Sequence, residues 1–133
     1  MSNNILIIDF GSQVTQLIAR RLREQGVYTE ILPSTAVADL KEMEKRLQAV
    51  AGVILSGGPN SVTHANTPRA PQIIFDSGKP VLGICYGQQT LCAQLGGRVE
   101  AGNSREFGHA EIQILQENPL FEGVWPQGSN QSV

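Results

Sequence analysis

The feature that most constrains this chain is a short apolar run that ends at a cysteine flanked by glycines. Val81–Ile84 predicts a buried parallel strand, and beyond Gly87 the apolar residues change to helical spacing. Cys85 lies between the two, and glycines suit a turn too tight for neighbouring Cβ atoms. The pattern predicts a nucleophile elbow, where the free N–H groups of a helix start favour the thiolate. The alternative is a buried structural cysteine, because free cysteine is a small hydrophobe.

Composition excludes several classes of protein. The chain has 133 residues, enough for one domain, and a net charge of −2 gives no basic footprint for nucleic acid. No apolar run reaches the roughly 18 residues that span a bilayer. The two cysteines have no second pair or histidine at metal-ligand spacing, and reduced cysteines are typical of the cytosol. We therefore expect a cytoplasmic globular domain with no nucleic-acid, membrane or metal partner.

Strands and helices alternate along the first hundred residues. Predicted strands span residues 4–9, 27–32, 49–55 and 81–84, and predicted helices span 14–25, 38–47, 70–75 and 87–95. This alternation predicts right-handed βαβ units and an α/β fold: an open, mostly parallel sheet with helices on both faces. Ligands of such sheets collect at the carboxyl ends of the strands. Asp9, Ser56 and Cys85 should therefore share one edge of the sheet.

The last third of the chain carries weaker signals. Residues 98–100 predict a brief strand, and the alternation over 110–115 predicts a half-exposed antiparallel strand with its isoleucines inward. Residues 118–121 predict a helical turn capped by asparagine. The polar stretch 126–133 has no period and is expected to be a disordered tail.

A paired glycine follows the third predicted strand, in Ser56-Gly57-Gly58-Pro59-Asn60-Ser61. It is either a flexible exit from the strand or an anion-binding turn whose backbone N–H groups point at Cys85. A phosphate loop is disfavoured because the GxxxxGK[ST] pattern is absent from it. Asp9, at the end of the first strand, either caps the next turn or positions a substrate.

These motifs together resemble a known family. Gly83–Gln89 resembles the nucleophile motif of class I glutamine amidotransferases, and Ser56–Pro59 resembles their oxyanion loop. Three further segments resemble the GMP-synthase branch of that family: residues 9–21, 68–71 and 105–108. The resemblance runs from Ile5 to about Phe121 and implies a flavodoxin-like fold whose final strands are missing from this chain.

The resemblance implies a thioester mechanism for hydrolysis of glutamine. Cys85 would attack the side-chain amide carbon, and the amides of Gly58 and Tyr86 would hold the oxyanion. Gln89 and Gly57 match family positions that contact the substrate. The ammonia would pass to an ATP-pyrophosphatase (synthetase) module, either fused or separate, that uses ATP and Mg²⁺ to aminate XMP to GMP. No cofactor is expected in this chain.

One departure from the family pattern matters. The family completes its triad with a His and a Glu two residues apart, whereas neither His64 nor His109 belongs to such a pair. We therefore expect 1–133 to be a partial domain, nearly inactive alone, since loss of a general acid–base group costs roughly 10²–10⁴-fold. The alternatives are another class I amidotransferase, serving anthranilate or carbamoyl phosphate synthesis, or a non-catalytic flavodoxin-like binding module.

Overall fold

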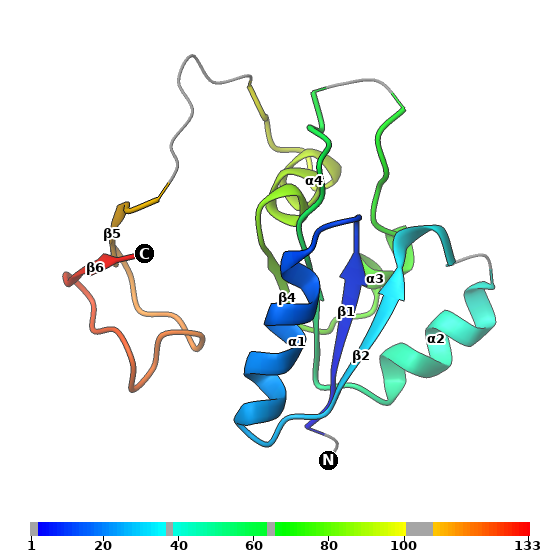
Figure 1. The fold of residues 1–133 in the computed structure, drawn as a ribbon, viewed down its shortest axis with the longest axis horizontal. Helices are drawn as coiled ribbons and strands as arrows, with labels where there is room; N and C mark the ends of the chain where they lie inside the picture. The colour runs from blue at the N-terminus through cyan, green and yellow to red at the C-terminus, as the bar shows by residue number, and fades with distance from the viewer. Residues whose placement is uncertain (1–2, 37–38, 64–65, 101–107) are drawn as a thin grey trace. The chain divides into compact units, whose positions relative to one another are not determined.

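A computed structural model describes residues 3–36, 39–63, 66–100 and 108–133 of the chain. The described residues belong to two compact units, one that ends at Glu100 and one that continues to Val133 (Figure 1). The first unit holds the parallel sheet and its helices. The second unit holds a pair of short antiparallel strands.

The first unit is built on a four-stranded parallel sheet. Its strands are β1 (Ile5–Asp9), β2 (Thr29–Pro33), β3 (Gly52–Leu55) and β4 (Val81–Gly83). The order across the sheet is β2-β1-β3-β4, and every neighbouring pair is parallel. This is the order of flavodoxin-like sheets, in which ligands bind where the order reverses, at the carboxyl ends of β1 and β3. The predicted open parallel sheet is confirmed.

In the part of the chain that the structure describes, three α-helices and one short 3-10 turn connect the strands of the sheet, and a fourth helix follows β4. They are α1 (Val14–Glu24), η1 (Ser34–Ala36), α2 (Leu40–Gln48), α3 (Gln72–Asp76) and α4 (Tyr86–Gln94). Local chemistry sets several ends: Asp39 caps α2 by accepting from two backbone amides, and Gly26 follows α1 at φ +78°. Among the described residues, we find no helix with the length and apolarity needed to cross a bilayer.

Both faces of the sheet are apolar, and helices cover each of them (Figure 1). Leu6 and Ile8 of β1 join one buried cluster, together with Met43 and Leu47 of α2. The intervening strand residue, Ile7, joins a second cluster, which contains Ala19 of α1. Successive side chains of β1 therefore point to opposite faces of the sheet and join two different hydrophobic clusters, as expected of a strand buried on both sides.

The brief strand predicted for residues 98–100 is wrong. These residues follow α4 without pairing to any described strand, and Arg98 forms a surface ion pair with Glu100 at 2.6 Å. Side-chain alternation alone does not make a strand, because a strand also requires a backbone partner at hydrogen-bonding distance.

The second unit shows that the chain end contains a strand. β5 (Glu111–Gln113) pairs antiparallel with β6 (Asn130–Ser132), so the disordered tail predicted for 126–133 differs from the structure over β6. The predicted inward face of β5 is only half right. Ile114 is 3% exposed, whereas Ile112 is 37% exposed, because a two-stranded ribbon offers little area for burial.

A turn follows β5 as predicted. The amide of Leu120 donates to Oδ1 of Asn118 at 2.9 Å, and the amide of Phe121 donates to the carbonyl of Asn118 at 2.9 Å. The asparagine therefore caps this turn with both its side chain and its backbone.

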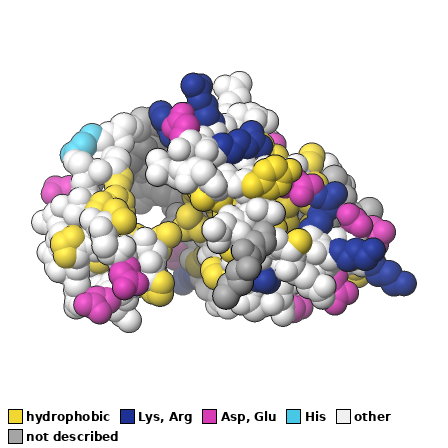
Figure 2. Space-filling model, turned by 90° about the horizontal axis from the view of Figure 1, so that it is seen from below, with side chains coloured by type: hydrophobic (Ala, Val, Ile, Leu, Met, Phe, Trp, Pro, Cys, Tyr) yellow, Lys and Arg dark blue, Asp and Glu magenta, His cyan; other side chains and the backbone are white. Residues whose placement is uncertain are grey.

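Charged side chains are distributed differently in the two units. Over one part of the face seen in Figure 2, Lys and Arg side chains lie among Asp and Glu side chains, whereas another part shows Asp and Glu side chains alone. The described residues of the second unit include three glutamates but neither lysine nor arginine, although the whole chain is near-balanced, with 10 basic and 12 acidic residues.

Candidate active site

Cys85 lies at a sharp turn between β4 and α4. Its backbone has φ 54° and ψ −118°, a conformation that side-chain-bearing residues rarely adopt. Such a conformation costs of order 1–3 kcal/mol and persists only where surrounding contacts enforce it. The residue is exposed and its thiol is free. The predicted elbow is therefore present, and the buried structural cysteine is not what the structure shows.

The flanking glycines allow this turn to form. A Cβ at Gly83 would lie 2.7 Å from the α-carbon of Gln88, and a Cβ at Gly87 would lie 1.9 Å from the carbonyl oxygen of Leu55. The same carbonyl accepts the amide of Ile84 at 2.9 Å. The start of α4 is thus pressed directly onto the end of β3, and only glycine fits at the contact.

The double-glycine loop lies beside the elbow. A Cβ at Gly57 would be 3.3 Å from the Cβ of Cys85, so the two backbones are near neighbours. A Cβ at Gly58 would be 2.3 Å from the carbonyl oxygen of Phe10, which follows β1. The ends of β1, β3 and β4 therefore meet at one edge of the sheet, as the sequence predicts.

The backbone amides of Tyr86 and Gly58, from the start of α4 and from the double-glycine loop, lie at this edge of the sheet. In the first turn of α4, Gly87 donates to Ile84 and Gln88 donates to Cys85, both at 3.0 Å. Within the described ranges, the amides of Tyr86 and Gly58 have no acceptor in the protein. These are the two donors predicted for the oxyanion, and they come from the two segments that meet at Cys85.

The carboxylate of Asp9 stabilises the turn after β1 through hydrogen bonds to neighbouring residues of the chain. Its Oδ1 accepts from the amides of Gly11 and Ser12, at 2.9 and 3.2 Å, and from the hydroxyl of Thr15 at 2.8 Å. The Thr15 oxygen is also 2.7 Å from the hydroxyl of Ser56, which is fully buried. Of the two roles considered for Asp9, capping is the one these contacts support.

Thr15→Val should destabilise the first unit by about 1–3 kcal/mol, because it leaves the buried Ser56 hydroxyl without its partner. Urea unfolding followed by circular dichroism measures the change. The matched control is Thr63→Val, whose hydroxyl bonds Ser61 on the exposed surface, and which should cost at most about 0.5 kcal/mol. Equal losses in the two variants would contradict the assigned role of the buried pair.

The side chains of Tyr86 and Gln89 both have partners in the protein. The Tyr86 ring is 2% exposed and meets Phe10 edge-on, with 5.1 Å between ring centroids. Oε1 of Gln89 accepts from the amide of Val62 at 3.0 Å and from the hydroxyl of Ser61 at 3.3 Å. Tyr86 can therefore contribute only its backbone to a ligand, whereas the contact of Gln89 with substrate stays a prediction.

Cys92 and His109, which were also considered from the sequence, have other partners in the structure. Cys92 is half-buried, with its Sγ 3.6 Å from the carbonyl of Arg98. His109 belongs to the second unit, where its Nε2 bonds the hydroxyl of Ser132. His64 and residues 105–107 lie outside the described residues.

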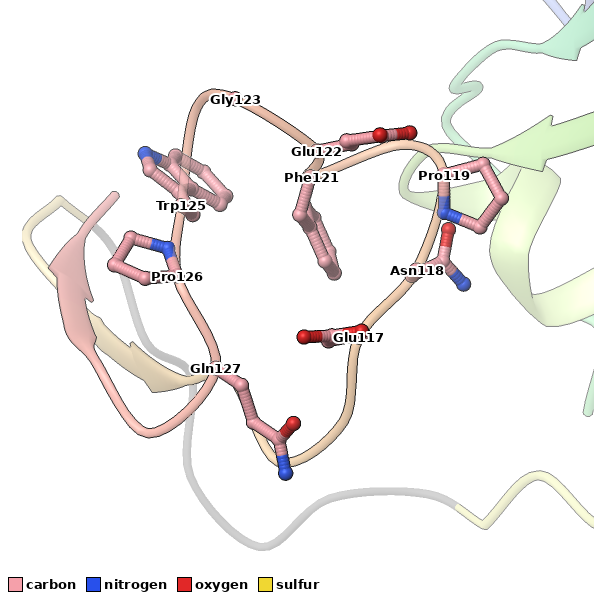
Figure 3. Close-up of a pocket in the computed structure, with 9 residues that line it drawn as sticks. All are labelled: Glu117, Asn118, Pro119, Phe121, Glu122, Gly123, Trp125, Pro126 and Gln127. Carbon is pink, nitrogen blue, oxygen red and sulfur yellow. The ribbon is translucent and has the colours of Figure 1, made fainter.

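The second unit contains a hollow of its own, of about 480 Å³. Figure 3 shows the Phe121 ring and the Glu117 carboxylate pointing into the loop that surrounds it. The Phe121 ring is also stacked with that of Trp125, at 5.5 Å between centroids. None of the predicted site residues lines this hollow.

The fold and the elbow together define a class of protein. The family model for class-I glutamine amidotransferases matches residues 6–129, and the chain belongs to that family. It is 61% identical over 131 residues to the glutamine-hydrolyzing GMP synthase of Brucella melitensis biotype 1, and equally similar to that of Brucella ovis. These matches cover 98% of this chain but only 25% and 24% of the relatives, so the chain spans about a quarter of their length.

A solved structure agrees with this assignment. It is a protein from Thermoplasma acidophilum, described as one subunit of a GMP synthase, and it superposes with a TM-score of 0.66 at 25% sequence identity. The match covers 100% of this chain and 68% of that structure. The flavodoxin-like fold inferred from the strand order is therefore the fold of a known relative.

Proposed function

We propose that this chain is the glutaminase part of a GMP synthase and that Cys85 is its nucleophile. The observation that carries the proposal is the exposed thiol of Cys85 at positive φ, beside the double-glycine loop. A nucleophile held at a strained turn between a strand and a helix is the arrangement that exposes it to a carbonyl carbon.

The reaction proceeds through a thioester. The Cys85 sulfur forms a bond to the side-chain amide carbon of glutamine, and the carbonyl electrons move onto its oxygen. The amides of Gly58 and Tyr86 then donate to that oxyanion, a contribution worth about 10²–10³ in rate for each donor. When the tetrahedral intermediate collapses, the C–N bond breaks and ammonia leaves with an added proton. Water then cleaves the thioester to release glutamate and restore the thiol.

The wider assignment follows from the similarity to GMP synthases. The ammonia passes to a synthetase module, fused or separate, that uses ATP and Mg²⁺ to aminate XMP. This chain binds glutamine and needs no cofactor of its own, and it acts in the cytoplasm, where free thiols stay reduced. We assign the proton transfers of the glutaminase step to no residue of this chain.

A labelling experiment tests the nucleophile. A glutamine-shaped diazoketone should alkylate Cys85 at least about 10-fold faster than Cys92, because only the first thiol lies at a site that orients the reagent. Peptide mass spectrometry gives both rates in one sample, so Cys92 is an internal control. Added glutamine should slow the reaction at Cys85, whereas asparagine should not. Equal and slow labelling of both thiols would favour the non-catalytic binding module.

A further inference from the structure

Arg69 belongs to the segment Pro68–Pro71, which the proposed mechanism does not use. Its guanidinium nevertheless contacts both halves of the candidate site. Nη1 donates to the hydroxyl of Tyr86 at 2.9 Å, and Nη2 donates to the carbonyl of Val62 at 3.2 Å. Tyr86 directly follows the elbow cysteine, and Val62 lies four residues after Gly58. One side chain therefore bridges the elbow and the end of the double-glycine loop.

Val62 is fixed from three directions. Its amide donates to Oε1 of Gln89 at 3.0 Å, and its carbonyl accepts from Arg69. Its side chain is 8% exposed and belongs to the main core cluster. These contacts leave the residue little freedom to shift relative to α4.

The other end of the loop is fixed independently. The amide of Ser56 donates to the carbonyl of Ile8 at 3.0 Å, and its buried hydroxyl bonds Thr15. Between the two anchored ends lie only Gly57–Ser61, including the amide predicted to hold the oxyanion. A donor that is already in place before the reaction lowers the barrier more than one that must be ordered during it.

We propose that Arg69 is a positioning residue for the glutaminase reaction: it fixes the Gly58 amide relative to Cys85 by bridging Val62 and Tyr86. The inference rests on the function proposed above. Arginine suits the task because its planar fork reaches two acceptors at once, whereas lysine presents a single point charge. The Tyr86 hydroxyl in turn donates to the carbonyl of Pro68, the residue before Arg69, so Tyr86 is bonded to this segment by a second hydrogen bond.

Amide hydrogen exchange tests the bridge without any chemistry at the thiol. In Arg69→Gln, exchange over residues 57–63 should become roughly 10-fold faster, as expected for loss of a charge-assisted hydrogen bond. Exchange in α1 should not change. Arg69→Lys keeps the charge, so its exchange rate over residues 57–63 should lie between those of the unaltered chain and Arg69→Gln. This second variant still tests the bridge if Arg69→Gln folds poorly. The matched control is Arg20→Gln on the surface of α1, where the side chain is 77% exposed.

Two electrophiles then test the consequence for the reaction. Iodoacetamide needs only access to the Cys85 sulfur, so its rate should be unchanged in Arg69→Gln. The glutamine-shaped diazoketone must also be oriented, and its rate should fall by roughly 10- to 100-fold, as for a misplaced catalytic group. A merely structural role would slow neither reagent selectively.

The outcomes separate the two proposals. Unchanged exchange over 57–63, or equal effects on both electrophiles, overturns the positioning role of Arg69 while the labelling preference for Cys85 stands. If the diazoketone does not label Cys85 faster than Cys92 in the unaltered chain, the glutaminase assignment fails. The proposed role of Arg69 in the reaction then fails with it. Faster exchange with selective loss of diazoketone reactivity supports the proposal.

Discussion

Replacing Cys85 by alanine is expected to lower glutamine-dependent GMP formation by at least about 10³-fold, because the proposed thioester forms on the sulfur of this residue. The assay uses a chimera in which this chain replaces the matching 131 residues of the Brucella melitensis enzyme, which is 61% identical to it. The rest of that enzyme supplies what this chain does not span. Ammonia-dependent GMP formation should be retained, since free ammonia bypasses the glutaminase step.

The matched control for this experiment is Cys92→Ala in the same chimera. Cys92 lies in α4, which Cys85 precedes, and its thiol makes a weak 3.6 Å contact with the carbonyl oxygen of Arg98, so both activities should stay near those of the unaltered chimera. Glutamine-dependent activity that survives in Cys85→Ala would show that another residue is the nucleophile. Loss of ammonia-dependent activity as well would point to misfolding, which circular dichroism would reveal.

The parallel sheet and the elbow could be predicted because their signals are local. Ile5–Asp9 and Gly52–Leu55 are apolar runs in the sequence, and each is followed by turn residues. Glycines two residues before and after Cys85 mark a backbone with no room for Cβ atoms, and the structure gives the neighbouring atoms that fill that room. In such cases a pattern of a few residues carries the physical constraint.

The strand at 130–132 could not be predicted because its cause is distant in the sequence. Asn130–Ser132 is polar and has no period, and it becomes a strand only by pairing with Glu111–Gln113. The reverse error occurred at 98–100, where the residues suit a strand but no partner lies beside them among the described residues. Backbone pairing decided both cases, and side-chain pattern decided neither.

The contacts that fix the site were also beyond sequence reasoning. Gln94 bonds both the amide and the carbonyl of Ala70, at 3.0 and 2.9 Å, across 24 residues of sequence. The Thr15–Ser56 pair spans 41 residues. Polar side chains at such positions read as ordinary helix or turn residues until the packing brings their partners close. The candidate nucleophile could thus be predicted from the sequence, whereas the hydrogen bonds that hold the surrounding segments in place could be identified only from the structure.

Gly87→Ala is expected to destabilise the first unit by about 3–5 kcal/mol, a large fraction of the 5–15 kcal/mol that stabilises a typical domain. The new Cβ would lie 1.9 Å from the carbonyl oxygen of Leu55 and 2.4 Å from its carbonyl carbon. Backbone of a central strand cannot move aside as a flexible side chain would, so α4 must shift. That shift would also carry the Cys85 thiol and the Tyr86 amide out of register with the double-glycine loop.

Urea unfolding followed by circular dichroism measures this loss, because all the described α-helices lie in the first unit. The matched control is Gly96→Ala, just after the same helix. Gly96 has φ +90° but no atom within 4 Å of a built Cβ, so only the backbone conformation is strained, at a cost of about 1–2 kcal/mol. A Gly87→Ala loss no larger than that of the control would mean that α4 does not press on β3, and the geometry assigned to the elbow would be wrong.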